Sequence, residues 1–248
     1  MKLWFSLYDR KNYTGPEAAF YDTTRLSFTT LFESNSGTIK QELDDYLKHR
    51  GMQSYFNTSM VNKLDAWKTI PLKTWNVELY KYQTYFPKTM ALINSVDGLV
   101  SASFNMLGPH CVIKPHCGDT NGIYRCHMGL AIPAQVPVCG FRVKEEWRSW
   151  EEGKLLVFVD ANHHEATNQS NENRFIFLFD VVRPEFKRRE QYICSTVITS
   201  LFMQGGAEKL KVLYLIPTAI QKFIAAGLVP FAFMAIHCRN FLYKFVQR

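Results

Sequence analysis

Apolar residues recur along this chain at two different spacings, one typical of helices and one typical of strands. In the stretch 36–50 (SGTIKQELDDYLKHR), the apolar residues Ile39, Leu43, Tyr46 and Leu47 share one face of a helix. The stretch starts with a serine and a glycine, and it ends in basic residues before another glycine. This pattern predicts an amphipathic helix.

A second helix is predicted within 87–96, where a proline suits the first helical turn. From about residue 99 the chain changes to short runs rich in β-branched and aromatic residues, separated by clusters of glycine, proline, asparagine and aspartate. The strands predicted from these runs are 99–106, 123–132, 138–143, 154–159 and 173–182. Many short strands at this spacing indicate a sandwich or barrel, for which a jelly roll is one standard arrangement. The predicted class is mainly β, in an α+β arrangement with flanking helices.

These changes in the pattern of apolar and polar residues divide the chain into three parts. We predict a helical or mixed support region over 1–98, a β-rich core over 99–186 and a basic, apolar helical tail over 187–248. At 248 residues, with 47% hydrophobic and 15% aromatic content, the chain can bury a substantial core. This composition excludes disordered and fibrous classes.

The tail contains two apolar runs, 212–220 and 223–236. Neither reaches the length of about 20 residues that crosses a bilayer as a helix, and Pro217 and Pro230 interrupt them further. Runs of this size are typical of a buried core helix or of a segment at a membrane surface.

All of the excess charge lies in the same tail. The whole chain has a net charge of +7, and residues 187–248 contain nine lysines or arginines against two glutamates. Such an asymmetry points to an anionic surface, either a membrane or a nucleic acid. The basic residues at the edges of the apolar runs are Lys209, Lys211, Lys222, Arg239 and Lys244. Their position favours a membrane over nucleic acid, because long cationic side chains beside apolar surface can reach lipid headgroups. The alternative is a helix pair packed on the core, or a dimer contact.

The first residues, MKLWFSLYDRKNYTGPE, carry charges and lack the apolar segment of a secretory signal. We therefore expect a cytoplasmic protein that is peripheral to the inner face of a membrane or anchored there. The six cysteines are irregularly spaced in a chain too large to need disulfides, so free thiols are expected. A zinc site formed by Cys111, Cys117, Cys126 and His127 is a weaker alternative, because it lacks a C-x-x-C pair.

Candidate chemistry lies at three places: His116 after a proline, the pair His163 and His164 after a predicted strand, and Arg174 on the next strand. In an antiparallel hairpin, His164 can lie at one strand end while Arg174 points inward from its neighbour. Neutral imidazoles bind iron and leave coordination positions open, and a buried arginine can grip a dicarboxylate with two hydrogen bonds. Adjacent residues of a strand face opposite ways, so only one of His163 and His164 is expected at a metal.

Each of these residues also has a simpler interpretation. A histidine beside a proline is often a loop residue, and Arg174 could pair with Glu172 or Asp180. Trp150 is expected to pack rather than to contact a substrate. The order and spacing of the whole set favour a common site.

From about residue 75 to residue 186, the chain resembles the aspartyl/asparaginyl β-hydroxylase family of 2-oxoglutarate oxygenases, which have a double-stranded β-helix (jelly-roll, cupin-like) fold. The segments that carry the resemblance are FNMLGP from Phe104, PHCGDTN from Pro115, RCHMGLAIP from Arg125, WEEGK from Trp150, FVD from Phe158, HEA from His164 and RFIFLFDVVRPE from Arg174. The resemblance implies that 99–186 is a jelly-roll catalytic core.

The resemblance also implies roles for individual residues. By position, His116 and His164 match the iron ligands of the family, and Arg174 matches its clamp on the distal carboxylate of 2-oxoglutarate. Arg125 and His127 match a basic pair near the proximal end of this cosubstrate.

Asn105 falls where a small polar side chain supports the clamp. One departure concerns the metal: the residue two positions after His116 is Gly118, so the usual H-x-D/E carboxylate of the wider oxygenase class is absent. The resemblance implies a two-histidine iron site with water in the place of the carboxylate, as in the animal peptidyl hydroxylases of the family. Asp119 is one position late and is a weaker candidate ligand.

The implied activity is that of an Fe(II)-dependent dioxygenase that uses 2-oxoglutarate and O2 and hydroxylates an aliphatic C–H bond. Bacterial relatives act on lipid acyl chains at the inner face of the membrane, and animal relatives act on peptidyl aspartate or asparagine. The basic, apolar tail favours a lipid acyl chain. The alternatives are a β-hydroxylase of peptidyl or free amino acids, and a jelly-roll module of weak catalytic power that binds membranes.

Overall fold

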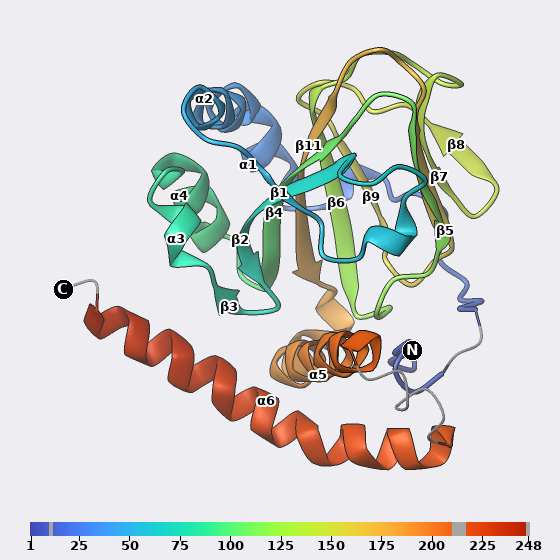
Figure 1. The fold of residues 1–248 in the computed structure, drawn as a ribbon, viewed down its shortest axis with the longest axis vertical. Coiled ribbons are helices and arrows are strands. Elements are labelled where there is room, and N and C mark those ends of the chain that lie inside the picture. Colours follow the sequence, from blue (N-terminus) through green and yellow to red (C-terminus); the bar gives the residue numbers. More distant parts are fainter. Residues whose placement is uncertain (10–11, 210–216, 247–248) are drawn as a thin grey trace.

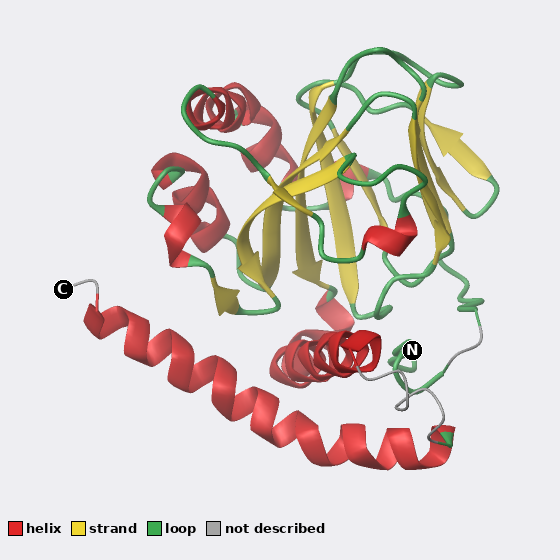
Figure 2. Ribbon diagram, in the orientation of Figure 1, coloured by secondary structure: helices red, strands yellow, loops and turns green. Residues whose placement is uncertain are grey.

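The computed structural model describes residues 1–9, 12–209 and 217–246. Two antiparallel sheets face each other, and helices cover the outer face of the larger sheet and one end of its strands (Figure 1, Figure 2). This is the predicted jelly-roll core with flanking helices.

The larger sheet has the strand order β1-β2-β4-β11-β6-β9, with β3 paired to β2. Its strands are β1 (Gln53–Ser54), β2 (Trp67–Thr74), β3 (Val77–Glu78), β4 (Leu99–Leu107), β6 (Ile123–Ala131), β9 (Leu155–Val159) and β11 (Arg174–Val182). The smaller sheet has the order β5-β10-β7-β8. Its strands are β5 (Cys111–His116), β7 (Cys139–Val143), β8 (Glu146–Arg148) and β10 (His164–Asn168). The five predicted strands are confirmed as β4, β6, β7, β9 and β11, whereas β1, β2, β3, β5, β8 and β10 were not predicted.

The helical elements follow the chain from the N-terminal region to the tail. They are η1 (Thr23–Arg25), α1 (Thr29–Ser34), α2 (Ser36–Leu47), η2 (Thr58–Met60), α3 (Tyr80–Gln83), α4 (Pro87–Ser95), η3 (Pro184–Arg189), α5 (Glu190–Lys209) and α6 (Thr218–Val246). The two helices predicted within 36–50 and 87–96 are confirmed as α2 and α4.

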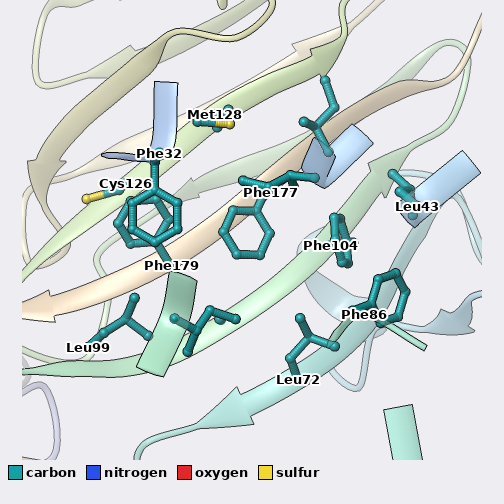
Figure 3. Close-up of a cluster of buried hydrophobic side chains, with 14 of the residues drawn as sticks. Phe32, Leu43, Leu72, Phe86, Leu99, Phe104, Cys126, Met128, Phe177 and Phe179 are labelled. Atoms are coloured by element: carbon teal, nitrogen blue, oxygen red, sulfur yellow. The ribbon is translucent and has the colours of Figure 1, made fainter. Parts of the chain in front are cut away.

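The alternation of side chains along β11 separates the core from the site. Phe177 and Phe179 face the helices, where the ring of Phe179 stacks on Phe32 of α1 with centroids 4.2 Å apart (Figure 3). The even-numbered residues of β11, from Arg174 to Asp180, face the smaller sheet instead, because successive side chains of a strand point to opposite faces. Arg174 and Asp180 therefore both lie on the inner face of the barrel.

The larger sheet extends into the segment predicted as a support region. β2 pairs with β4 over most of its length, with Thr69 opposite Asn105 and Trp67 opposite Leu107. Part of one wall of the barrel thus comes from residues before 99, although the three-part division of the chain remains a proposal.

The tail was predicted to lie outside the catalytic core, and its first helix, α5, packs on the ends of core strands. Ile193, Cys194 and Val197 of α5 are fully buried in a cluster that includes Val100 and Ile123 at the ends of β4 and β6. α5 therefore covers these strand ends, and the predicted boundary of the core at residue 186 remains a proposal.

The prediction that Pro230 breaks the last apolar run is wrong. α6 continues through Pro230, which is exposed, and a helix of this length retains its hydrogen bonds on both sides of one proline. In the described part of the chain, one helix, over Ala219–Tyr243, is long and apolar enough to cross a membrane. The earlier part of the predicted run 212–220, up to residue 216, and Lys211 lie outside the described residues.

Candidate active site

A cavity of about 320 Å³ lies between the two sheets. Its lining includes all six residues that the sequence singled out, namely His116, His164, Arg174, Arg125, His127 and Asn105. Residues from β4, β5, β6, β10 and β11 thus meet in one place, because each faces the interior of the barrel.

His116 and His164 lie side by side at the ends of neighbouring strands. His116 is the last residue of β5, His164 is the first of β10, and the two are partners in register, with ring centroids 4.2 Å apart. The Nδ1 of His116 lies 2.8 Å from the carbonyl oxygen of Lys114, and the Nδ1 of His164 lies 2.7 Å from that of Asn162. A carbonyl only accepts, so each Nδ1 carries the proton and each Nε2 keeps its lone pair.

Both histidines are neutral at physiological pH. Burial lowers the pKa of His116 to about 4 and lowers the pKa of His164 well below its ordinary value. Neutral rings with free Nε2 atoms are suited to bind a metal ion. His163, next along the chain, does not line the cavity, and its carbonyl oxygen instead accepts a hydrogen bond from Lys144.

Arg174 is a buried cation with unused donors. Its side chain is 1% exposed, and its guanidinium lies over the ring of Trp150 at 4.5 Å from the centroid. Nε and Nη1 have no hydrogen-bond partner among the described residues. Burial lowers the pKa of Arg174 to about 10, so the group stays charged at neutral pH. A buried charge without an anion is unfavourable, which makes this position suited to a carboxylate ligand.

Arg125, by contrast, is already paired. Its Nε and Nη2 each donate to a carboxylate oxygen of Asp180 at 2.9 Å, and Nη1 donates to Asp160. Burial alone would lower the pKa of Arg125, but the two carboxylates raise it well above its ordinary value. Asp180, considered above as a partner of Arg174, therefore binds Arg125 instead. A contact between Arg125 and a cosubstrate remains a prediction.

His127 and Asn105 complete the wall around Arg174. Both ring nitrogens of His127 lack partners in the described structure, and burial lowers its pKa well below the ordinary value. Its ring packs against Phe141, with centroids 4.8 Å apart. The Oδ1 of Asn105 accepts a hydrogen bond from Nε1 of Trp67 at 3.4 Å. Their roles toward a cosubstrate also remain predictions.

Steric crowding at Gly118 accounts for the lack of an H-x-D/E carboxylate two positions after His116. A Cβ atom added to Gly118 would overlap the carboxylate of Asp160, whose Oδ2 accepts a hydrogen bond from the backbone N–H of Asp119 at 3.0 Å. Asp160 therefore occupies the space that a side chain at 118 would need. Asp160 is the last residue of the FVD segment and was not predicted to have a role, although a carboxylate directly after a predicted strand is a usable signal.

No group of three or more His, Cys, Asp or Glu side chains that could hold a metal ion occurs within the described residues. The four residues of the alternative zinc site, all of which are described, do not form such a group. Asp119 lines the cavity, and burial raises its pKa to about 6. His116, His164 and Arg174 line the same cavity, where the two imidazoles could hold a metal ion and the guanidinium could hold a carboxylate.

Comparison with known proteins identifies the family. The family model described as Aspartyl/Asparaginyl beta-hydroxylase matches residues 33–184, which is more than half of the chain. The chain belongs to this family. The match covers every candidate residue of the cavity named above, and it ends just before α5.

Two relatives illustrate the range of the β-hydroxylase family. The ornithine lipid ester-linked acyl 2-hydroxylase of Rhizobium tropici is 29% identical over 169 residues, which are 66% of this chain and 60% of that protein. The aspartyl/asparaginyl beta-hydroxylase of Mus musculus is 34% identical over 110 residues, which are 42% of this chain and 15% of that protein. The chain thus spans less than two thirds of the length of either relative.

Among solved structures, HygX from Streptomyces hygroscopicus with nickel and 2-oxoglutarate bound aligns with a TM-score of 0.44 and 10% identity, covering 62% of this chain and 81% of that one. A Cupin_2 domain from Enterobacter cloacae aligns with a TM-score of 0.33 and 14% identity, covering 48% and 98%.

Proposed function

We propose that this chain is an Fe(II)- and 2-oxoglutarate-dependent dioxygenase that hydroxylates an aliphatic C–H bond in the acyl chain of a membrane lipid. The observation that carries the proposal is the presence, in one cavity, of two neutral histidines and a buried arginine with unused donors. The two histidines can bind an iron ion, and the arginine can bind one carboxylate of a dicarboxylate.

In the proposed reaction, His116 and His164 hold the iron through Nε2, because Nδ1 of each ring is engaged with a main-chain carbonyl. Bound iron supplies the activation of O2 that accompanies conversion of 2-oxoglutarate to succinate and CO2. Arg174 holds the distal carboxylate of 2-oxoglutarate, and the ring of Trp150 keeps the guanidinium in place. The aromatic wall around His127 excludes water from this end of the cavity.

A lipid substrate at the inner face of a membrane is supported by α6. Large apolar side chains of α6 are exposed, including Phe223 at 81%. An apolar surface of this kind on a helix marks a membrane or protein interaction site. One relative in the family is a hydroxylase of lipid acyl chains.

The test is succinate formation from 2-oxoglutarate with Fe(II), measured with a total membrane lipid extract and, separately, with a peptide library. We expect the lipid extract to raise succinate formation above the rate without substrate, and mass spectrometry to find lipids that have gained one oxygen atom. Arg174→Lys is the matched control, because it retains the charge and loses the planar pair of donors.

Two other outcomes would replace the proposal. Hydroxylation of aspartate or asparagine in peptides, with no change in lipids, would establish the peptide β-hydroxylase that the mouse relative's name describes. Absence of succinate with either substrate and in their absence, together with binding to liposomes, would establish a membrane-binding module.

A further inference from the structure

A second cavity, with a volume of about 480 Å³, lies between three parts of the chain that are far apart in the sequence. They are the N-terminal segment over residues 1–9, the junction of η3 and α5, and the start of α6. Figure 1 shows the N-terminus beside α5, on the side of the molecule where α6 begins. The residues that line this second cavity are all different from those that line the candidate active site.

Aromatic side chains on one side of the second cavity are held in place by the core. Phe5 is 5% exposed and belongs to the cluster that includes Ile193 of α5. Its ring lies edge-on to Tyr192, with centroids 5.7 Å apart, and to Tyr8, with centroids 6.0 Å apart. The backbone of Phe5 also forms an antiparallel bridge with that of Thr120. These contacts fix the aromatic side of the cavity before any ligand binds, which lowers the entropic cost of binding.

Three basic residues, one from each part of the chain, line the second cavity: Lys2, Arg189 and Lys222. All three are exposed, and none of them forms an ion pair with another described residue. The guanidinium of Arg189 lies over the ring of Tyr192, at 4.9 Å from the centroid. Among the described lining residues Asp9 is the one carboxylate, so the lining has an excess of two positive charges. A phosphomonoester, with a charge of about −1.5 to −2 at neutral pH, complements this excess.

The exposed apolar face of α6 begins beside this cavity. Lys222 lies among Ile220, Phe223 and Ile224, whose side chains are all exposed. A lysine in such a setting can reach a phosphate group while its apolar neighbours enter the acyl region of a membrane. A free phosphate ion or a nucleic acid needs no apolar surface beside the cations. The combination therefore favours the headgroup of a lipid.

We propose that the cavity between Lys2, Arg189 and Lys222 binds the headgroup of an anionic phospholipid, with a preference for a phosphomonoester such as that of phosphatidic acid. This lipid holds the protein on the membrane and is not the substrate. The inference goes beyond the proposed function: it requires α6 to meet a membrane, but not that any lipid is hydroxylated. It also gives a role to the N-terminal segment, which lies outside the family match over residues 33–184.

The test measures binding of the full-length protein to phosphatidylcholine vesicles that contain either phosphatidic acid or phosphatidylglycerol, adjusted to equal surface charge. Equal charge makes the diffuse attraction the same for both kinds of vesicle, so a headgroup site appears as tighter binding to phosphatidic acid. We expect the parent to bind the phosphatidic acid vesicles about fivefold more tightly or better, which corresponds to one additional basic contact.

A variant with Lys2→Gln, Arg189→Gln and Lys222→Gln should lose this preference. It should also bind phosphatidic acid vesicles about 100-fold more weakly than the parent, because each basic group near an anionic surface contributes about fivefold. The three side chains are exposed, so the variant should fold like the parent, and thermal unfolding checks this.

The matched control carries Arg25→Gln, Lys63→Gln and Lys88→Gln. It removes the same residue types and the same charge at three exposed positions that do not line the second cavity. This control should keep the preference for phosphatidic acid.

Equal binding of the parent to the two kinds of vesicle, or equal losses in the two triple variants, would overturn this inference, because charge alone would then explain the attraction. Inorganic phosphate, titrated into the protein without vesicles, tests the other source of the same chemistry. Saturable phosphate binding without a vesicle preference would assign the cavity to a free anion and likewise overturn the inference. A parent that prefers phosphatidic acid vesicles yet hydroxylates no lipid would overturn the proposed function and leave this inference intact.

Discussion

At the scale of single residues, the orientation of the two histidine rings determines what the site can bind. Because the Nδ1 of His116 and the Nδ1 of His164 are both engaged with main-chain carbonyls, the two Nε2 atoms are left for a metal. Each ring carries its proton on Nδ1, because the neighbouring carbonyl oxygen can only accept a hydrogen bond.

The first prediction compares three histidines. His116→Ala and His164→Ala should each lower iron affinity by more than about 100-fold, beyond the 10–100-fold loss typical of a supporting contact. His163→Ala should retain iron, since His163 does not line the cavity. Anaerobic titration with Fe(II) measures all three, and equal losses in the three variants would contradict the assignment.

The second prediction concerns Arg174→Lys. Lysine retains a positive charge but offers a point charge in place of two parallel donors and loses the planar contact with Trp150. Affinity for 2-oxoglutarate should fall about tenfold or more, equivalent to about 1.4 kcal/mol, while iron binding persists. Calorimetric titration of the iron-loaded protein measures this. A variant that binds 2-oxoglutarate as tightly as the parent would place the cosubstrate elsewhere.

The third prediction concerns Gly118→Ala. The added methyl group would meet the carboxylate of Asp160, which is held by Arg125 and by the backbone of Asp119. Overpacking of this kind destabilises proteins by about 1–3 kcal/mol. Chemical denaturation should show this loss, and Gly118→Asp should fail to gain iron affinity. Tighter iron binding in Gly118→Asp would mean that Asp160 yields its place to a new ligand.

At the scale of elements, α6 presents a narrow buried face and a broad exposed one. The buried residues Ala225, Val229 and Ile236 are spaced at three- to four-residue steps or their multiples, which is the pattern of one stripe facing α5. The remaining surface of the helix is rich in exposed apolar side chains, namely Ile220, Phe223, Ile224, Phe231, Phe233, Met234, Phe241, Leu242 and Tyr243. A soluble helix normally places polar residues there, so this face calls for an apolar partner.

The fourth prediction is that Phe223→Gln combined with Phe231→Gln weakens binding to anionic liposomes. Each phenylalanine should contribute about 1.5–3 kcal/mol when inserted, so the double change should reduce partitioning by at least about 100-fold. Protein stability should change little, because both side chains are exposed. Leu64→Gln is the control, since Leu64 is 73% exposed and lies far from α6 in the sequence.

Sedimentation with liposomes at low and high salt measures this binding. Salt should weaken the binding of the parent without abolishing it, because screening affects the basic residues and not the apolar ones. Equal binding of parent and double variant would assign the exposed face of α6 to a protein partner.

At the scale of the whole molecule, the N-terminal segment holds the loop next to the histidines. The backbone N–H of Ser6 donates to the carbonyl oxygen of Asp119 at 3.0 Å, and that of Trp4 donates to the side chain of Asn121 at 2.8 Å. Further along the segment, Glu17 forms a buried ion pair with Arg183 at the end of β11, with an N–O distance of 2.7 Å. Parts of the chain more than a hundred residues apart thus depend on one another.

The fifth prediction concerns the pH dependence of stability. Burial alone would raise the pKa of Glu17, but hydrogen bonds from Arg183 and Tyr13 hold it below its ordinary value. The folded state therefore binds this proton less readily than the unfolded state, so the contribution is present above the ordinary carboxyl pKa and is lost as pH falls below it. The unfolding free energy of the parent should fall more steeply between about pH 5 and pH 3 than that of Glu17→Gln. Parallel curves from denaturation at each pH would show that the pair does not contribute.

The sequence by itself predicted the helices α2 and α4, five strands and six of the residues that line the cavity. These features depend on local patterns. The alternation along β11 follows from the two-residue repeat of a strand, and it places Arg174 and Asp180 on one face without any knowledge of their partners. The segments shared with the family likewise include every candidate residue of the cavity.

Tertiary structure alone decided which groups meet. The sequence could not show that Asp180 pairs with Arg125 and leaves Arg174 open, because both arginines are inward residues of β-strands and the choice depends on how β6 and β11 align. It also could not show that residues 190–209 form a helix whose inner face is buried, because only packing against the distant strand ends buries it. Periodicity is a property of neighbours in the chain, whereas pairing and burial depend on residues that folding brings together from far apart.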